Sequence, residues 1–95
     1  MPYIKQDKRK DYDKLIYEIT CVLLDSGPPG KYGNTADVGD LNYVISSIIW
    51  NLFDSDTCYS TGNNLMGVLE CVKQEFYRRK LSEYENIKIK ENGDL

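Results

Sequence analysis

The chain has 95 residues, of which 41% are hydrophobic and 28% are charged, which predicts one soluble folded domain with a thin core. Its apolar stretches fall far short of the roughly 20 residues that span a bilayer, and residues 1–5 lack the apolar block of a signal peptide. We therefore expect a cytoplasmic protein. Histidine is absent, which removes the usual general base, the usual zinc ligand and the Ser-His and Cys-His nucleophile pairs.

The basic residues gather at the two ends of the sequence. The net charge is −3, yet eleven of the twelve Lys and Arg lie in residues 1–14 or 73–95. A general nucleic-acid binder shows a basic excess over the whole domain, so this distribution argues against a nucleic acid polymer as partner. It permits a small anionic ligand at a focused site. Three widely spaced cysteines, Cys21, Cys58 and Cys71, predict free thiols and no metal site.

The first half of the chain predicts an arm, a helix, a loop and a second helix. Residues 1–6 form the arm, which we expect to pack on its own core, and a helix follows over about 7–25 with Asp7 as its cap. Its apolar stripe consists of Tyr12, Leu15, Ile16, Ile19, Val22 and Leu23. Residues 26–38, rich in Gly and Pro, predict a loop. Asp40 is the expected N-cap of the second helix, whose apolar residues repeat with the cleanest helical period: Leu41, Val44, Ile45, Ile48, Ile49 and Leu52.

A second loop over residues 53–63 precedes the longest helical pattern. Ser60 or Thr61 is its expected closing cap, and Asp54 and Asp56 lack the further oxygens that a calcium loop needs. The next helix is predicted over residues 64–80, with a stripe of Leu65, Leu69, Val72 and Phe76. A capping-box pattern over residues 82–85 predicts that a short fourth helix restarts there, and Gly93 is its expected C-cap.

These elements predict an all-α fold within a single domain, residues 1–95, built as a small bundle of three long helices plus a short C-terminal helix. About twenty large apolar residues would form its core. The conformational entropy lost on folding offsets most of the free energy that their burial contributes. Eight tyrosines and one tryptophan exceed what such a core needs and are favoured at half-buried interfaces. We therefore expect a homo-oligomer.

Two interpretations fit the charged end of the third helix. Glu and Arg residues three and four apart form ordinary intrahelical pairs, or Arg78 and Arg79 form an anion clamp beside an aromatic ring. Arg9 or Lys10 would support the clamp if the first helix lies alongside. The candidate ligand-binding residues are Tyr77, Arg78, Arg79, Lys73, Arg9, Asp40, Asn42 and Tyr43. Catalysis is disfavoured, because no spacing marks Glu70, Glu75 or Asp40 as an acid–base pair, and no cofactor or metal is expected.

Three sequence blocks resemble a family of short proteins of bacteria and their phages that is described as a domain of unknown function. They are M-P-Y-I at residues 1–4 with the Lys/Arg run that follows it, G-D-L-N-Y-V-I at 39–45, and G-V-L-E-C-V-K-Q-E-F-Y-R-R at 67–79 together with E-N-G-D at 91–94. A looser analogy of design links the chain to phage proteins that sequester nucleotide immune signals. We expect a non-enzymatic oligomeric sponge for an anionic nucleotide, such as a cyclic dinucleotide or an ADP-ribose derivative. The alternative is a helical adaptor protein without a small ligand.

Overall fold

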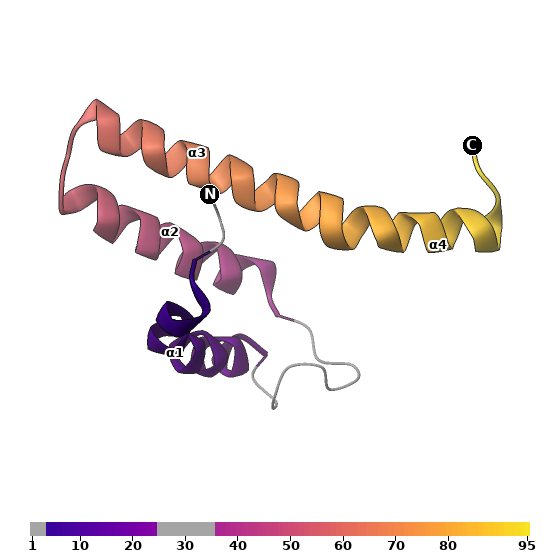
Figure 1. Ribbon diagram of the computed structural model, residues 1–95, viewed down its shortest axis with the longest axis horizontal. Helices are drawn as coiled ribbons and strands as arrows, with labels where there is room; N and C mark the ends of the chain where they lie inside the picture. The colour runs from indigo at the N-terminus through magenta and orange to yellow at the C-terminus, as the bar shows by residue number, and fades with distance from the viewer. Residues whose placement is uncertain (1–3, 25–35) are drawn as a thin grey trace. The chain divides into compact units, whose positions relative to one another are not determined.

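The computed structural model describes residues 4–24 and 36–95, and within these ranges every regular element is helical. The elements are α1 (Gln6–Leu24), α2 (Val38–Asp54), α3 (Tyr59–Phe76), the π-helical turn η1 (Tyr77–Leu81) and α4 (Ser82–Asn92) (Figure 1). This confirms the predicted all-α class. The chain divides into two compact units, one that ends at Ser55 and one that comprises Asp56–Leu95, and each is described by itself.

Helix α1 begins at Gln6, so Asp7 lies inside its first turn and is not the cap that the sequence predicts. The backbone N–H of Lys8 donates to the carbonyl oxygen of Lys5 at 3.1 Å, which closes the turn ahead of the helix. The predicted arm at Met1–Tyr3 and the predicted loop up to residue 35 lie outside the described residues.

The N-cap of α2 is Asp37, and the prediction of Asp40 is wrong. Asp37 has an extended backbone, and its Oδ1 accepts hydrogen bonds from the N–H groups of Gly39 at 2.7 Å and Asp40 at 3.2 Å. Both residues are aspartates, but the N–H of Asp40 is itself one of the donors that a cap must satisfy. A side chain at Gly39 would bring its Cβ within 3.0 Å of the capping oxygen, so glycine leaves room for this contact.

The loop between α2 and α3 is shorter than the predicted 53–63, because α2 continues to Asp54 and α3 begins at Tyr59. Cys58 holds the N-cap position with an extended backbone and makes no side-chain capping bond, so the prediction of Ser60 or Thr61 as cap is wrong. Thr61 lies in the first helical turn and its hydroxyl donates to Asp56 Oδ2 at 3.0 Å. Thr61 is therefore a helical residue and not the cap.

The segments α3, η1 and α4 form one uninterrupted helix of 18, five and 11 residues, coloured orange to yellow in Figure 1. The short helix α4 begins at Ser82 as predicted, but the predicted capping box does not form, because Leu81 before it has helical backbone angles and there is no side-chain capping bond. The N–H of Ser82 donates to the carbonyl oxygen of Tyr77, five residues back. This i→i−5 bond defines a π-helical turn. Gly93 ends the helix as predicted, with φ at +87° and its N–H donating to Ile89 O at 2.8 Å.

No residue in the described part of the chain is buried, in contrast to the predicted core. Leu65 and Leu69 are half-buried, whereas Val72 and Phe76 are 58% and 60% exposed. The second unit consists of a single continuous helix and the residues at its ends, and one helix offers its own apolar stripe nothing to pack against. None of the described helices is both long enough and apolar enough to cross a bilayer.

Candidate functional site

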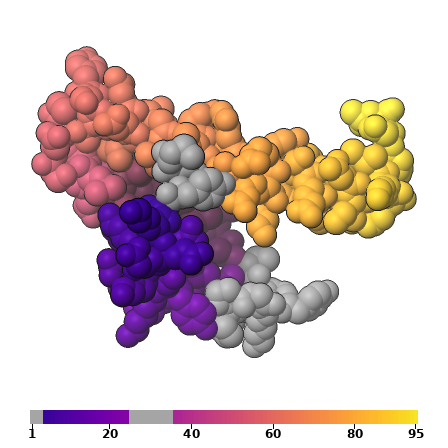
Figure 2. All heavy atoms as spheres, viewed as in Figure 1, coloured from indigo at the N-terminus to yellow at the C-terminus, as the bar shows by residue number. Residues whose placement is uncertain are grey.

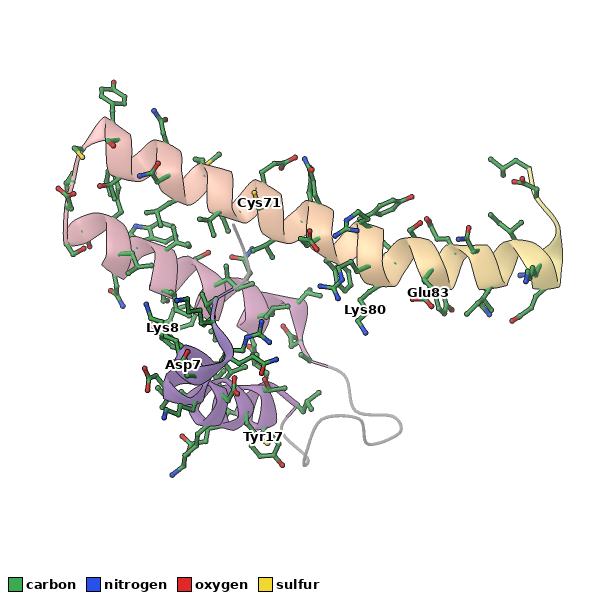
Figure 3. The ribbon with its side chains drawn as sticks, viewed as in Figure 1. Asp7, Lys8, Tyr17, Cys71, Lys80 and Glu83 are labelled. Atoms are coloured by element: carbon green, nitrogen blue, oxygen red, sulfur yellow. The ribbon has the colours of Figure 1, made fainter. Side chains whose placement is uncertain are left out.

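A concentration of positive charge lies where α3 meets the π-helical turn. Residues 73–80, called the basic segment below, carry four cations and one acid, for a net charge of +3 in a chain whose total is −3. In Figure 3, Cys71 precedes this segment on the helix, Lys80 lies on its last turn and Glu83 follows it on α4. Turns of π-helix are frequent at functional sites, so the position justifies a close description.

One carboxylate holds both arginines of the basic segment. Arg78 Nη2 lies 2.9 Å and 3.0 Å from the two carboxylate oxygens of Glu75, and Arg79 Nη1 lies 4.0 Å from Glu75 Oε2. The side chain of Glu75 is only 29% exposed, against 67% for Arg78. These are the intrahelical pairs of the first interpretation, at spacings of three and four residues. An anion that binds the arginines must therefore share them with Glu75 or displace it.

Lys73 belongs to a second local network, centred on Glu70. The ammonium group of Lys73 lies 3.2 Å from Glu70 Oε2, and Gln74 Nε2 donates to Glu70 Oε1 at 3.2 Å. The Gln74 hydrogen bond, together with the contact to Lys73, holds the pKa of the Glu70 carboxyl below its usual value. Glu70 is therefore ionised at neutral pH and is poorly suited to act as a general acid.

Tyr77 makes a contact that the sequence does not predict. Its hydroxyl donates to Glu85 Oε1 at 2.9 Å, eight residues away and beyond the usual spacing of helical side-chain pairs. This hydrogen bond and the nearby carboxylate charge raise the pKa of Tyr77 above its ordinary value. The tyrosine consequently remains a neutral phenol, with a ring that is half exposed.

Three of the predicted ligand residues, Lys73, Tyr77 and Arg78, lie along one concavity of about 660 Å³. The remaining residues in its described lining were not in the predicted ligand set: Glu70, Cys71, Gln74 and Glu75. Arg79 is not part of that lining. These seven residues lie on neighbouring rows of the same helical segment. One short segment therefore supplies cations, an amide, carboxylates and an aromatic ring.

The other predicted residues belong to the first unit. Arg9 Nε donates to the carbonyl oxygen of Ile4 at 3.2 Å, and Asp40 contributes its N–H to the Asp37 cap. Asn42 Oδ1 accepts from Ser46 Oγ at 3.1 Å, and Tyr43 is 73% exposed. Asn42 and Tyr43 line a second concavity, of about 600 Å³, along α2 with Gly39, Ser46, Ser47, Trp50, Asn51 and Asp54. The predicted set is therefore divided between the two units.

Within residues 4–24 and 36–95, no three potential ligands among Cys, Asp and Glu are placed to hold a metal ion. A feature that the sequence did not single out is the thiol of Cys58, whose Sγ lies 3.4 Å from Thr61 Oγ1. The Thr61 hydroxyl and then the backbone N–H of Thr61 lower the pKa of this thiol. Helix N-termini lower thiol pKa values in the same way.

The fold and the basic segment define an all-helical protein with a cation-rich π-helical turn. The chain belongs to the family described as Domain of unknown function (DUF6899), whose model matches residues 1–95. This confirms the resemblance to a domain of unknown function. No curated protein and no solved structure is detectably similar to the chain.

Proposed function

We propose that this chain is a non-enzymatic binding protein that takes an anionic, nucleotide-type small molecule at the basic segment. The observation that carries the proposal is that Lys73, Tyr77 and Arg78 line the same concavity. Its volume of about 660 Å³ is in the range of small-molecule sites, which runs from roughly 300 to 1,000 Å³.

The chemistry of these three side chains suits a phosphorylated ligand with a flat ring. The ammonium of Lys73 and the planar guanidinium of Arg78 donate charge-assisted hydrogen bonds to phosphate oxygens. The neutral phenol of Tyr77 offers a face on which a base can stack. Glu75, which holds Arg78 at 2.9 Å, limits the affinity, because the guanidinium must exchange one anionic partner for another.

The proposed biological role is sequestration of a nucleotide immune signal, either a cyclic dinucleotide or an ADP-ribose derivative. In this proposal the chain is a phage protein that acts in the host cytoplasm against bacterial defence, as a homo-oligomer. The motifs G-D-L-N-Y, G-V-L-E-C-V-K-Q-E-F-Y-R-R and E-N-G-D are proposed as its family signature. The sequence contains no histidine, which is consistent with binding in place of catalysis.

Isothermal titration of the full chain with cyclic di-GMP and with ADP-ribose tests the proposal. We expect saturable binding of at least one probe, and the variant Lys73→Ala/Arg78→Ala should weaken it by at least about a hundredfold, because each charge-assisted hydrogen bond contributes about 1.5–3 kcal/mol. The matched control, Lys88→Ala/Lys90→Ala, removes two cations from α4 away from the concavity. The proposal would be overturned if neither probe binds, or if the control loses as much affinity as Lys73→Ala/Arg78→Ala does.

The adaptor role is the second candidate, and the concavity on α2 favours it. Trp50 and Tyr43 line that concavity and are 64% and 73% exposed, and exposed aromatics of this kind commonly dominate protein interfaces. A thermal-shift series with the same nucleotides separates the two roles. A shift that is lost in Lys73→Ala/Arg78→Ala supports the nucleotide site, whereas no shift with any nucleotide leaves the adaptor role as the better account.

A further inference from the structure

The apolar stripe of α3 continues through the π-helical turn into α4. Leu65, Leu69, Val72 and Phe76 follow the alternating spacing of four and three residues that keeps side chains on one face. Extended without interruption, this spacing would next reach Arg79, Glu83 and Asn86, which are all polar. The stripe would then end at Phe76.

The π-helical turn changes the phase by one residue. A single extra residue in a helix rotates everything after it by about 100°, so the positions that follow Phe76 become Lys80, Tyr84 and Ile87. Two of these three are large apolar side chains. The stripe therefore runs over both sides of η1 only because the turn is π-helical.

Beyond its half-buried start at Leu65 and Leu69, the stripe is open to solvent. Val72, Phe76, Tyr84 and Ile87 are 58%, 60%, 55% and 51% exposed, and the atoms of α4 lie at the yellow end of the chain in Figure 2. An isolated helix is marginal in water unless its apolar face is packed. A partner with a matching stripe would supply that packing.

The charges along the same helix favour a second copy of the chain as the partner, in the antiparallel orientation. The basic segment has a net charge of +3, whereas residues 83–94, the acidic segment, carry four acids and two cations for a net charge of −2. Two parallel copies would place each basic segment beside the other. Two antiparallel copies place each basic segment beside the acidic segment of the other copy, which is electrostatically favourable.

We infer that the apolar stripe from Phe76 to Ile87 is the contact surface of a homodimer in which the helices over residues 71–92 of two copies pair antiparallel. The two-fold axis lies near Leu81 and Ser82. At this register Phe76 meets the partner's Ile87 and Lys80 meets the partner's Glu83. One register thus satisfies the apolar and the charged contacts together, as a two-fold interface requires. The inference is independent of the proposed nucleotide ligand.

Sedimentation equilibrium of the full chain tests the surface with a matched pair of substitutions. Ile87→Glu places a charge on the stripe, whereas Ile89→Glu makes the same change two residues later and off the stripe. We expect a wild-type dimer whose dissociation constant rises at least about tenfold in Ile87→Glu, since a buried unpaired charge is costly, and changes little in Ile89→Glu. A monomeric or trimeric wild type, or equal effects of the two substitutions, would overturn the inference.

Deletion of Lys80 tests the role of the π-helical turn. Without this residue the turn can become α-helical, and Tyr84 and Ile87 rotate by about 100° away from Phe76. We expect retained helical circular dichroism with a weakened dimer, whereas Lys80→Ala, which removes the charge without the rotation, should weaken it less. A deletion variant that dimerises as tightly as the wild type would contradict the phase argument.

Spin labels determine the direction of pairing. In a background with Cys21, Cys58 and Cys71 replaced by Ala and the dimer verified, a single label at Asn92→Cys reports one distance between copies. The antiparallel register predicts about 30 Å between the labelled positions, and a parallel pair predicts about 10 Å. The short distance would exclude the proposed arrangement.

Discussion

The hydroxyl of Tyr77 donates to Glu85 Oε1 at 2.9 Å and joins the start of the π-helical turn to the first turns of α4. Eight residues of helix separate Tyr77 from Glu85 by about 12 Å along the axis, a gap that only a long side chain can close. The contact spans the segment whose backbone hydrogen bonds depart from the α-helical pattern. It therefore links the stability of the turn to the protonation state of one tyrosine.

The raised pKa of Tyr77 predicts a specific loss of stability at high pH. The stabilisation is fully present below the pKa of an unfolded tyrosine, about 10, and is lost as pH rises through the folded pKa, because the unfolded chain releases the proton first. Urea unfolding followed by circular dichroism at pH 8 and at pH 10.5 measures it. We expect a smaller pH dependence in Tyr77→Phe than in the wild type.

Tyr59→Phe is the matched control for this measurement, because Tyr59 is 92% exposed on the first turn of α3. This variant should retain the pH dependence of the wild type. If Tyr59→Phe and Tyr77→Phe reduce the pH dependence equally, then the hydrogen bond to Glu85 is not its source.

The cap of α2 predicts unequal effects for two neighbouring aspartates. Asp37→Ala removes the acceptor of two backbone N–H bonds and should lower the free energy of unfolding by about 1 kcal/mol. Asp40→Ala removes only a favourable charge in the first turn, for a cost of a few tenths of a kcal/mol. Urea titration at neutral pH distinguishes the two. A larger loss in Asp40→Ala would instead support the cap that the sequence suggests.

The lowered pKa of Cys58 predicts selective alkylation of this thiol. The thiolate is the reactive form, so Cys58 should react with iodoacetamide at a lower pH than an ordinary cysteine does. Peptide mapping after brief labelling between pH 6 and pH 9 follows each cysteine separately. In Thr61→Val, which removes the hydroxyl 3.4 Å from Sγ, the labelling of Cys58 should shift to higher pH. An unchanged profile would contradict the assigned cause.

The helices were predictable where a long apolar period decides the structure, but their N-terminal caps were not. The period of α2 is visible in sequence, but its cap depends on whether Asp37 or Asp40 supplies the oxygen, and both are acceptable cap residues. The capping-box pattern at Ser82 is equally compatible with a break and with a continuous helix. The backbone N–H of Ser82 bonds to Tyr77 O, and the chain continues without a break.

The candidate site was partly predictable, because helical geometry fixes which side chains along a helix can meet. Pairs at three and four residues follow directly from helical geometry, so the contacts of Glu75 with Arg78 and Arg79 were visible as spacings. The contact between Tyr77 and Glu85 was not visible as a spacing, because it crosses a π-helical turn, which holds more residues per turn than the α-helix on which those spacings rest. A signal was nonetheless present: Tyr84 and Ile87 are one residue out of phase with the stripe that ends at Phe76.

The position of Glu75 between two guanidinium groups gives a single acidic residue control over the electrostatic potential above the π-helical turn. Neutralising it in Glu75→Gln would raise the net charge of the basic segment from +3 to +4 without altering a single cation. Phosphate affinity and its sensitivity to added salt would then increase together. The strength of anion attraction at this surface is therefore adjustable through Glu75, while all four cations of the basic segment stay in place.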